Sequence, residues 1–256
     1  MKLTRIAAIA ALALLATTTL AAAKDWSTVR IGTEGAYPPF NSIDAAGELK
    51  GFDIDVAKAL CDKMKVKCTF VAQDWDGIIP ALLAGKFDAI VASMSITDER
   101  KKKVAFTDRY YTTPGTFMVA KDSPTTDITP AGLKGKTIGA QSSTTDATYL
   151  DNKYKDSEIK LYATQDEANA DLAAGRLDAV LADKFPLYEF LKTDSGKGCC
   201  KFTGPDLPDV NPDGQGIAVR QEDKDLTEML NKALKEIKAD GTYKKINDAY
   251  FPFSIE

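Results

Sequence analysis

The sequence of 256 residues contains no histidine. Without imidazole, Ser-His-Asp and Cys-His catalysis are excluded, and a zinc site would have only carboxylates and thiolates as ligands. Positive charge is also scarce, because the 33 Lys and Arg residues are outnumbered by 37 Asp and Glu residues. No basic patch with interleaved aromatic residues offsets this balance, so we expect no nucleic-acid partner. We also expect no metal and no cofactor.

Long apolar runs are missing as well. The uninterrupted stretch Ile6–Leu15 has 10 residues, whereas a membrane span needs about 20. Lys2 and Arg5 precede this stretch and the small residues Ala21–Ala23 follow it, an order typical of a secretory signal. We therefore predict that residues 1–23 are a signal peptide cleaved near Ala23. No cysteine follows the stretch to carry a lipid, so we expect a soluble protein of a Gram-negative periplasm.

The sequence has only four cysteines. Cys61 and Cys68 flank the segment DKMKVK, and an oxidising compartment favours a structural disulfide between them. A metal site is the weaker interpretation, because it would need further ligands nearby. Cys199 and Cys200 are adjacent. This pair is compatible with a local disulfide, two thiols or a contact with a partner, and the sequence does not choose among them.

Short β-branched runs alternate with helical patterns along the chain, which predicts an α/β fold in one large or two small domains. The last helix ends before Gly241 and is followed by an aromatic tail. We expect strands at 29–33, 68–72, 89–92, 116–121, 137–140, 179–182 and 216–219, and helices at 52–64, 77–84, 144–153, 165–174, 184–193 and 224–240.

An internal repeat indicates two lobes built on one plan. GKFDAIVAS at Gly85–Ser93 returns as GRLDAVLAD at Gly175–Asp183, and IGTE at Ile31–Glu34 returns as IGAQ at Ile138–Gln141. In open α/β sheets, ligands bind outside the carboxyl ends of the strands. If the lobes face each other, the polar residues that end the four repeated segments point into one cleft.

The segment after the first repeated strand suits an anion. Ser95 follows the strand end, Thr97 can cap the next turn, and Arg100 presents a fork of donors that matches a carboxylate. From the second lobe, Ser142–Asp146, which includes Thr144 and Thr145, would add hydroxyls and free N–H groups. Helix capping is the alternative role of this Ser/Thr run.

Acidic and aromatic residues of the cleft suggest a zwitterion with a long side chain. Asp183, together with the Ser93 hydroxyl, can pair with an ammonium group, and Asp183 could cap the following helix at the same time. Glu34 suits a distal cation, or is an exposed surface acid. Tyr37 and Trp75 can flank the ligand's methylene groups. A core position is an alternative for Tyr37, and is less expected for Trp75, which stands between two aspartates.

The chain resembles the periplasmic solute-binding proteins of polar amino-acid ABC transporters, particularly the lysine/arginine/ornithine- and histidine-binding branch and its opine-binding relatives. The similar segments span nearly all of the chain after the signal: RIGTEGAYPPFN, GFDIDVAKALC, WDGIIPALLAGKFDAIVASMSITDER, TIGAQSSTTDATYL, AGRLDAVLAD and DGTYKKINDAYF. The resemblance implies two α/β lobes joined by crossing segments near Tyr111–Gly115 and Pro205–Pro212. We expect lobe 1 at 24–112 plus 212–256 and lobe 2 at 113–211.

Matched position by position, the resemblance implies a role for each site residue. It also implies the Cys61–Cys68 disulfide. Paired serines often end this strand in basic amino-acid binders, but here Ala92 precedes Ser93, so Ala92 keeps only a backbone contact. Glu34 stands where relatives commonly carry Asp. The α-carboxylate is assigned to Arg100, Ser95, Thr145 and Thr144, the α-ammonium to Asp183 and Ser93, the side chain to Tyr37 and Trp75, and its distal end to Glu34 with Asp53 behind it.

The expected function is capture of a basic amino acid, or of an arginine-derived opine, by closure of the lobes. The protein would act as a monomer and deliver this ligand to a membrane permease. Two alternatives use the same fold. One is an enzyme similar to cyclohexadienyl dehydratase, with Glu34 as the acid, and the other is a ligand-sensing module for a chemoreceptor.

Overall fold

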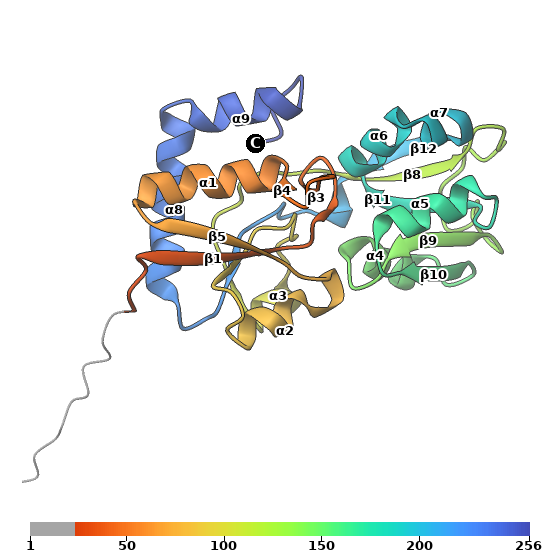
Figure 1. Ribbon diagram of the computed structural model, residues 1–256. Coiled ribbons are helices and arrows are strands. Elements are labelled where there is room, and N and C mark those ends of the chain that lie inside the picture. Colours follow the sequence, from red (N-terminus) through yellow and green to blue (C-terminus); the bar gives the residue numbers. More distant parts are fainter. Residues whose placement is uncertain (1–23) are drawn as a thin grey trace, which may run out of the picture.

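The computed structural model describes residues 24–256 and folds them into two α/β lobes, each built on a mixed sheet (Figure 1). The predicted two-lobe α/β fold class is confirmed. The predicted signal peptide, residues 1–23, lies outside the described residues. Within residues 24–256, no helix is both long enough and apolar enough to cross a membrane.

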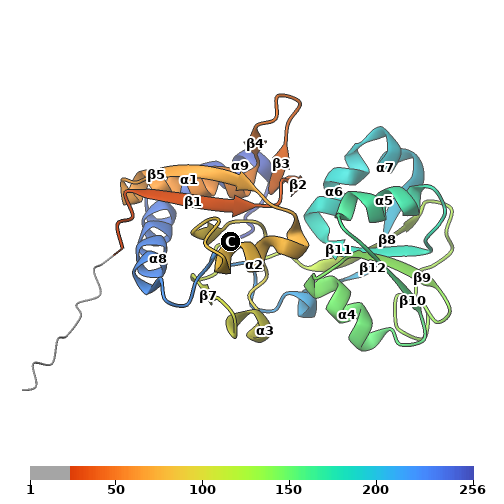
Figure 2. The same cartoon turned by 60° about the horizontal axis from the view of Figure 1, so that its bottom comes forward.

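The sheet of the first lobe contains four strands that run in the same direction and one antiparallel strand, β13, that returns from late in the sequence. β13 pairs antiparallel with both β6 and β7. In spatial order the strands are β5 (Lys67–Ala72), β1 (Thr28–Thr33), β6 (Ala89–Ile90), β13 (Ala218–Val219) and β7 (Ala105–Phe106). A small sheet of β2 (Ala36–Tyr37), β3 (Asn41–Ile43) and β4 (Leu49–Lys50) rises beside the second lobe (Figure 2).

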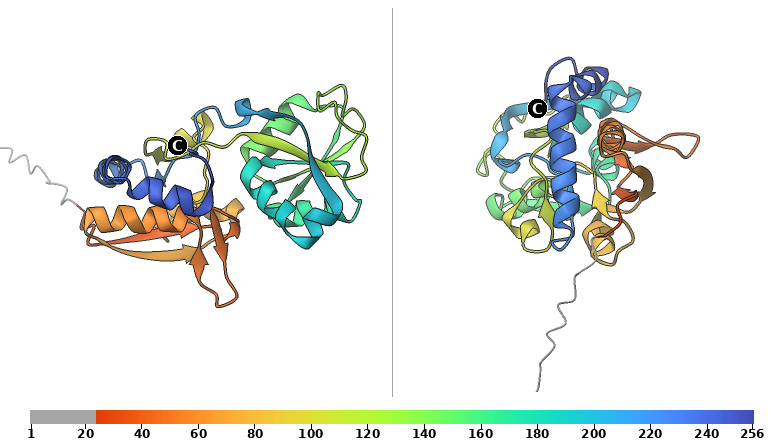
Figure 3. Two further views of the ribbon diagram at one scale, coloured as in Figure 1. Left: turned by 90° about the horizontal axis from the view of Figure 1, so that it is seen from above. Right: turned by 90° about the vertical axis from the view of Figure 1, so that its left-hand side faces the viewer.

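The sheet of the second lobe repeats this plan. Its first three strands are parallel, and β8 is antiparallel to its neighbours β11 and β12. In spatial order they are β10 (Glu158–Tyr162), β9 (Thr137–Gln141), β11 (Ala179–Asp183), β8 (Gly115–Ala120) and β12 (Cys200–Leu207). The chain crosses between β7 and β8 and returns between β12 and β13 (Figure 3). The lobe boundaries given above stay a prediction.

Helices cover both faces of each sheet. In the first lobe, α1, α8 and α9 lie on one face and α2 on the other, and in the second lobe α4 lies opposite α5 and α6. The helices are α1 (Phe52–Met64), α2 (Ile78–Leu83), α3 (Asp98–Lys101), α4 (Thr145–Lys153), α5 (Gln165–Ala173), α6 (Lys184–Lys192), α7 (Asp194–Cys199), α8 (Lys224–Ala239) and α9 (Thr242–Tyr250), with 3₁₀ turns η1 (Trp75–Gly77) and η2 (Pro208–Val210).

The repeated strands are apolar throughout because both of their faces are buried. Around β6, Ala89 and Val91 pack toward α1 and α8, whereas Ile90 packs toward α2. In β11, Leu181 packs toward α4 and Val180 toward α5 and α6. The sequence repeat is therefore a repeat of central strands.

The aspartate of each repeat fixes the start of the neighbouring strand. Asp88 accepts a hydrogen bond from the backbone N–H of Arg30 at 3.0 Å, and Asp178 accepts one from the backbone N–H of Thr137 at 2.9 Å. Each carboxylate thus ties its own strand to the parallel strand beside it. The Gly-x-x-Asp-Ala pattern recurs because the same strand pair is built twice.

Within residues 24–256, nine helices and strands were not predicted from the sequence: β2, β3, β4, β7, β10, β12, α3, α7 and α9. The aromatic tail contains α9, whose Tyr243 is buried and donates its hydroxyl to the carbonyl of Tyr110 at 2.5 Å. Gly241, at φ 81°, lies between α8 and α9 and lets the chain turn there. The predictions omitted β10 and β12, because both are edge strands with many exposed polar residues and lack the apolar pattern of a central strand.

The four cysteines form two disulfides. The predicted Cys61–Cys68 disulfide is confirmed, and it joins α1 to β5. Cys199 and Cys200 form a second disulfide between adjacent residues, where α7 passes into β12. The structure thereby selects the local disulfide among the interpretations that the sequence left open.

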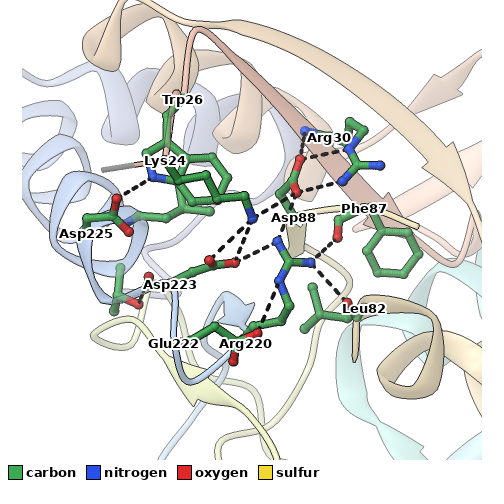
Figure 4. A network of polar contacts seen from close by, with 12 residues as sticks. Lys24, Trp26, Arg30, Leu82, Phe87, Asp88, Arg220, Glu222, Asp223 and Asp225 are labelled. Carbon is green, nitrogen blue, oxygen red and sulfur yellow. Dashed lines mark hydrogen bonds and ion pairs between the residues drawn. The ribbon is translucent and has the colours of Figure 1, made fainter. Parts of the chain in front are cut away.

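A buried ionic network stabilises the first lobe (Figure 4). Asp88 accepts hydrogen bonds from Arg30 Nε at 2.9 Å and from Arg220 Nη2 at 3.0 Å. Arg220 also pairs with Asp223 at 2.6 Å and donates to the carbonyl of Phe87, also at 2.6 Å. Burial opposes ionisation of Asp88, but the hydrogen bonds from both arginines outweigh it and lower the pKa of Asp88 to about 2.

We expect Asp88→Asn to lower the free energy of unfolding by about 3 kcal/mol, because it removes one of the two buried carboxylates, Asp88 and Asp223, that pair with Arg220. Asp178→Asn is the matched control, since it occupies the repeated position but its side chain is 39% exposed, against 5% for Asp88. Asp178→Asn should lower the free energy of unfolding by only about 1 kcal/mol. Urea unfolding followed by circular dichroism measures both losses, and equal losses would contradict the role given to the network.

Candidate functional site

A small cavity lies between the lobes, where the carboxyl ends of the repeated strands meet. All ten residues that the sequence analysis assigned to a direct ligand contact line this cavity, together with Gln141 and Asp146, whereas Ser142 and Ser143 of the predicted Ser/Thr segment do not. The lining consists of Glu34, Tyr37, Trp75, Ala92, Ser93, Ser95, Arg100, Gln141, Thr144, Thr145, Asp146 and Asp183.

Arg100 occupies one end of the cavity and is held from both lobes. Thr97 caps α3 by accepting the backbone N–H of Arg100 at 3.1 Å. The guanidinium donates to the carbonyls of Ser95 at 2.8 Å and Ser143 at 3.1 Å, and it lies over the ring of Trp75. Burial lowers the pKa of Arg100 to about 10, so the group is still protonated at neutral pH.

The Ser/Thr segment of the second lobe caps a helix and also lines the cavity. Thr144 is the N-cap of α4 and accepts the backbone N–H of Ala147 at 3.0 Å. Thr145 and Ser95 each donate a hydroxyl to the side-chain carbonyl of Asn211 at 2.7 Å. Asn211 lies on the returning crossing segment, and no sequence motif marked it.

Asp183 occupies the opposite side of the cavity. Its carboxylate accepts hydrogen bonds from the Tyr37 hydroxyl at 3.0 Å and from Asn211 Nδ2 at 2.6 Å. Asp183 is the N-cap residue of α6, as predicted, but its side chain makes no capping hydrogen bond to the helix. Burial, followed by the nearby charge of Asp146, raises the pKa of Asp183 well above its ordinary value.

Ser93 ends the first repeated strand in a left-handed conformation, with φ at 54°. Its hydroxyl donates to Asp53 at 3.1 Å, and Tyr110 and Asn41 also donate to this buried carboxylate. We predicted Asp53 behind Glu34, but its hydrogen bonds place it behind Ser93. Because the Ser93 proton is directed to Asp53, the lone pairs of the Ser93 oxygen stay available for a donor on a ligand.

Glu34 is largely buried and accepts a hydrogen bond from Gln141 Nε2 of the second lobe at 2.6 Å. Burial raises the pKa of Glu34 to about 7, and the charges of Asp166, Asp74 and Asp76 add to the shift. The alternative of an ordinary exposed acid is therefore wrong. This end of the cavity has an excess of negative charge.

Tyr37 and Trp75 both line the cavity and pack against apolar residues of the first lobe. Tyr37 is 7% exposed and packs against Phe40 in the core of the first lobe. Trp75 is 9% exposed and packs with Ile78 beneath the cavity wall. We did not expect Trp75 to be buried, because Asp74 and Asp76 flank it. The turn η1 buries only the tryptophan and leaves both acids exposed.

Further contacts close the rim of the cavity. The Ser142 hydroxyl donates to Asp76 of the first lobe at 2.8 Å. The bonds from Gln141 to Glu34 and from Arg100 to the carbonyl of Ser143 also connect the lobes. Among the described residues, no three acids or cysteines are grouped so that they could hold a metal ion. The arrangement is one of buried charges of both signs facing a small enclosed space.

Proteins of similar sequence are named as amino-acid-binding proteins. The chain is 47% identical over 250 residues to the L-arginine-binding protein of Pseudomonas aeruginosa, covering 96% of this chain and 95% of that protein. It is 44% identical over 235 residues to the lysine/arginine/ornithine-binding periplasmic protein of Escherichia coli, covering 89% of each.

Solved structures show the same similarity. An ancestral arginine-binding protein bound to arginine superposes with a TM-score of 0.81 at 40% identity, covering 88% of this chain and 98% of that one. An ancestral amino acid-binding protein described as a precursor of cyclohexadienyl dehydratase gives a TM-score of 0.79 at 35% identity, covering 88% and 96%. The sequence pattern of the bacterial extracellular solute-binding proteins, family 3, matches residues 29–253, and the chain belongs to this family.

Proposed function

We propose that this protein binds a basic α-amino acid between its lobes in the periplasm and, as a monomer, delivers it to the permease of an ABC transporter. The observation that carries the proposal is the placement of a buried aspartate, a partly buried arginine and a partly buried glutamate around one cavity. A basic amino acid offers a matching carboxylate, ammonium and distal cation. The relatives named above bind arginine, or lysine, arginine and ornithine.

Each group of the ligand has a proposed partner in the cavity. The α-carboxylate pairs with the Arg100 guanidinium, because a planar fork of donors matches a carboxylate. The α-ammonium pairs with Asp183, and the distal cation pairs with Glu34. The other proposed contacts are Ser95, Thr144 and Thr145 to the carboxylate, Ser93 to the ammonium, Tyr37 and Trp75 to the methylene groups, and a backbone contact from Ala92.

Lobe closure follows from this division of contacts. Arg100 and Glu34 belong to the first lobe, whereas Asp183 and Thr145 belong to the second. A ligand reaches all of its partners only when the lobes approach, so its binding energy favours the closed form. We propose lobe 1 at 24–112 plus 212–256 and lobe 2 at 113–211, with the crossing segments as the hinge.

A dehydratase is the second candidate, because the pKa of Glu34 near 7 would suit a general acid and a precursor of such an enzyme is a structural neighbour. The charges of the cavity argue against it. Prephenate carries two carboxylates, whereas the cavity offers Arg100 as its one lining cation and three carboxyl groups. We therefore propose a binding protein without turnover. Release of phenylpyruvate from prephenate by the purified protein would overturn this choice.

A panel of amino acids tests the ligand class. We expect L-arginine, L-lysine and L-ornithine to raise the melting temperature, because each supplies the cation that Glu34 and its acidic neighbours attract. Differential scanning fluorimetry measures the shift. A response confined to neutral or acidic amino acids would contradict the proposal.

Substitutions test the two ends of the ligand. Arg100→Ala and Asp183→Ala should each weaken arginine binding at least tenfold, because each leaves a buried ligand charge without its partner. Arg176→Ala is a matched control, since Arg176 is exposed and pairs with Asp171 away from the cavity. Isothermal titration calorimetry should give the control the affinity of the wild type. Unchanged affinity in both cavity variants would refute the site.

Titration of Glu34 predicts a pH dependence. Below its pKa of about 7 the carboxyl group is neutral and no longer attracts a cation, so arginine affinity should fall as the pH drops from 8 to 6, by up to about tenfold. Glu34→Gln should bind arginine more weakly at pH 8 and show a shallower fall. The same pH profile in both proteins would contradict the role of Glu34.

A further inference from the structure

Asp146 is the charged group of the cavity that the proposed ligand contacts do not use. It is 4% exposed, and its Oδ1 atom has no hydrogen-bond partner within residues 24–256. Asp146 lies in the first turn of α4, where the helix dipole favours a negative charge. The dipole stabilises the charge but supplies no donor to Oδ1. A buried carboxylate oxygen that lacks a donor and faces a ligand cavity calls for a donor on the ligand.

The charges of the cavity lead to the same conclusion. A basic amino acid brings one carboxylate and two cations, and Arg100, Asp183 and Glu34 match these three groups. Asp146 is then a surplus acid in the wall of the cavity. Its charge raises the pKa of Asp183, so the two carboxyl groups lie close enough to interact.

The position of Asp146 places it beside the ammonium site. Its Oδ1 atom is 3.3 Å from the point that a Cβ atom would occupy on Gly115. Gly115 is the cross-strand neighbour of Asp183 in the β8–β11 pair. Asp146 and Asp183 therefore share one end of the second sheet.

A primary ammonium has three N–H donors to satisfy. Asp183 accepts one, since its oxygens already bind Tyr37 and Asn211 but keep further lone pairs. The Ser93 oxygen, whose own proton is directed to Asp53, accepts the second. The third donor has an acceptor in the orphan Oδ1 atom of Asp146.

We propose that Asp146 is a specificity-determining residue that accepts the third N–H of a primary α-ammonium and excludes N-carboxyalkyl amino acids, the opines. This inference rests on the proposed binding function. An opine has a secondary amine with two N–H donors, so one acceptor would lose its partner. Its extra carboxylate, attached to this nitrogen, would lie against Asp146 and Asp183, and the repulsion of like charges disfavours it.

Calorimetry with three ligands tests the proposal: L-arginine, Nα-methyl-L-arginine and octopine, the N-carboxyethyl derivative of arginine. Wild-type protein should bind Nα-methyl-L-arginine at least tenfold, and octopine at least a hundredfold, more weakly than arginine. In Asp146→Asn, arginine affinity should fall and the arginine-to-octopine ratio should narrow at least tenfold. Asp194→Asn is a matched control, because it removes an exposed first-turn acid of α7 in the same lobe and should keep the wild-type ratio.

The possible failures can be told apart. If arginine binds but the wild-type protein accepts octopine or Nα-methyl-L-arginine equally well, the inference on Asp146 is wrong and the proposed function stands. The inference on Asp146 is also wrong if Asp146→Asn keeps the wild-type ratio. If the wild-type protein binds no basic amino acid, both proposals are wrong. The methylated ligand needs only wild-type protein, so the test holds even if the variant does not fold.

Discussion

Burial of charge is the constraint on which the cleft depends. Arg100, Asp183, Asp146 and Glu34 all lose most of their contact with water between the lobes, and a buried charge is unfavourable unless an opposite charge or a set of hydrogen bonds compensates for it. Carbonyl oxygens hold the arginine, and Tyr37 with Asn211 holds Asp183. A zwitterion with a distal cation would bind to the donors and acceptors that these groups still have free.

The repeated strand pair puts these charges in place. In each lobe an aspartate, Asp88 or Asp178, hydrogen-bonds to the neighbouring parallel strand near the amino ends of both strands. The carboxyl ends of the two strands therefore lie at the same edge of the sheet. Two such edges face each other across the cavity. The first lobe adds the Arg30–Asp88–Arg220 network, which joins an early strand to the segment that returns from the second lobe. The ligand site therefore lies at the ends of the central strands of each sheet, β6 and β11.

Hydrogen bonds between distant segments decide which polar atoms remain free. Asp53 takes the Ser93 proton and leaves an acceptor, while Asn211 takes the protons of Ser95 and Thr145 and gives one of its own to Asp183. Such a network couples both lobes to the returning crossing segment. Movement of that segment during lobe closure would change which hydrogen-bond donors and acceptors are free to bind a ligand.

The sequence by itself determined the two α/β lobes, the edge of the sheets that carries the site and most of the lining, because a repeat with buried central strands fixes where strands end. It identified Asp183 and Glu34 because they end repeated strands at this edge, and Arg100 because its guanidinium, in the segment that follows the first repeated strand, suits a carboxylate. Only the tertiary structure decided the roles of Asn211, Asp53 and Asp146. Their roles depend on hydrogen bonds between segments far apart in the chain, and neither the spacing nor the periodicity of the sequence predicts such bonds.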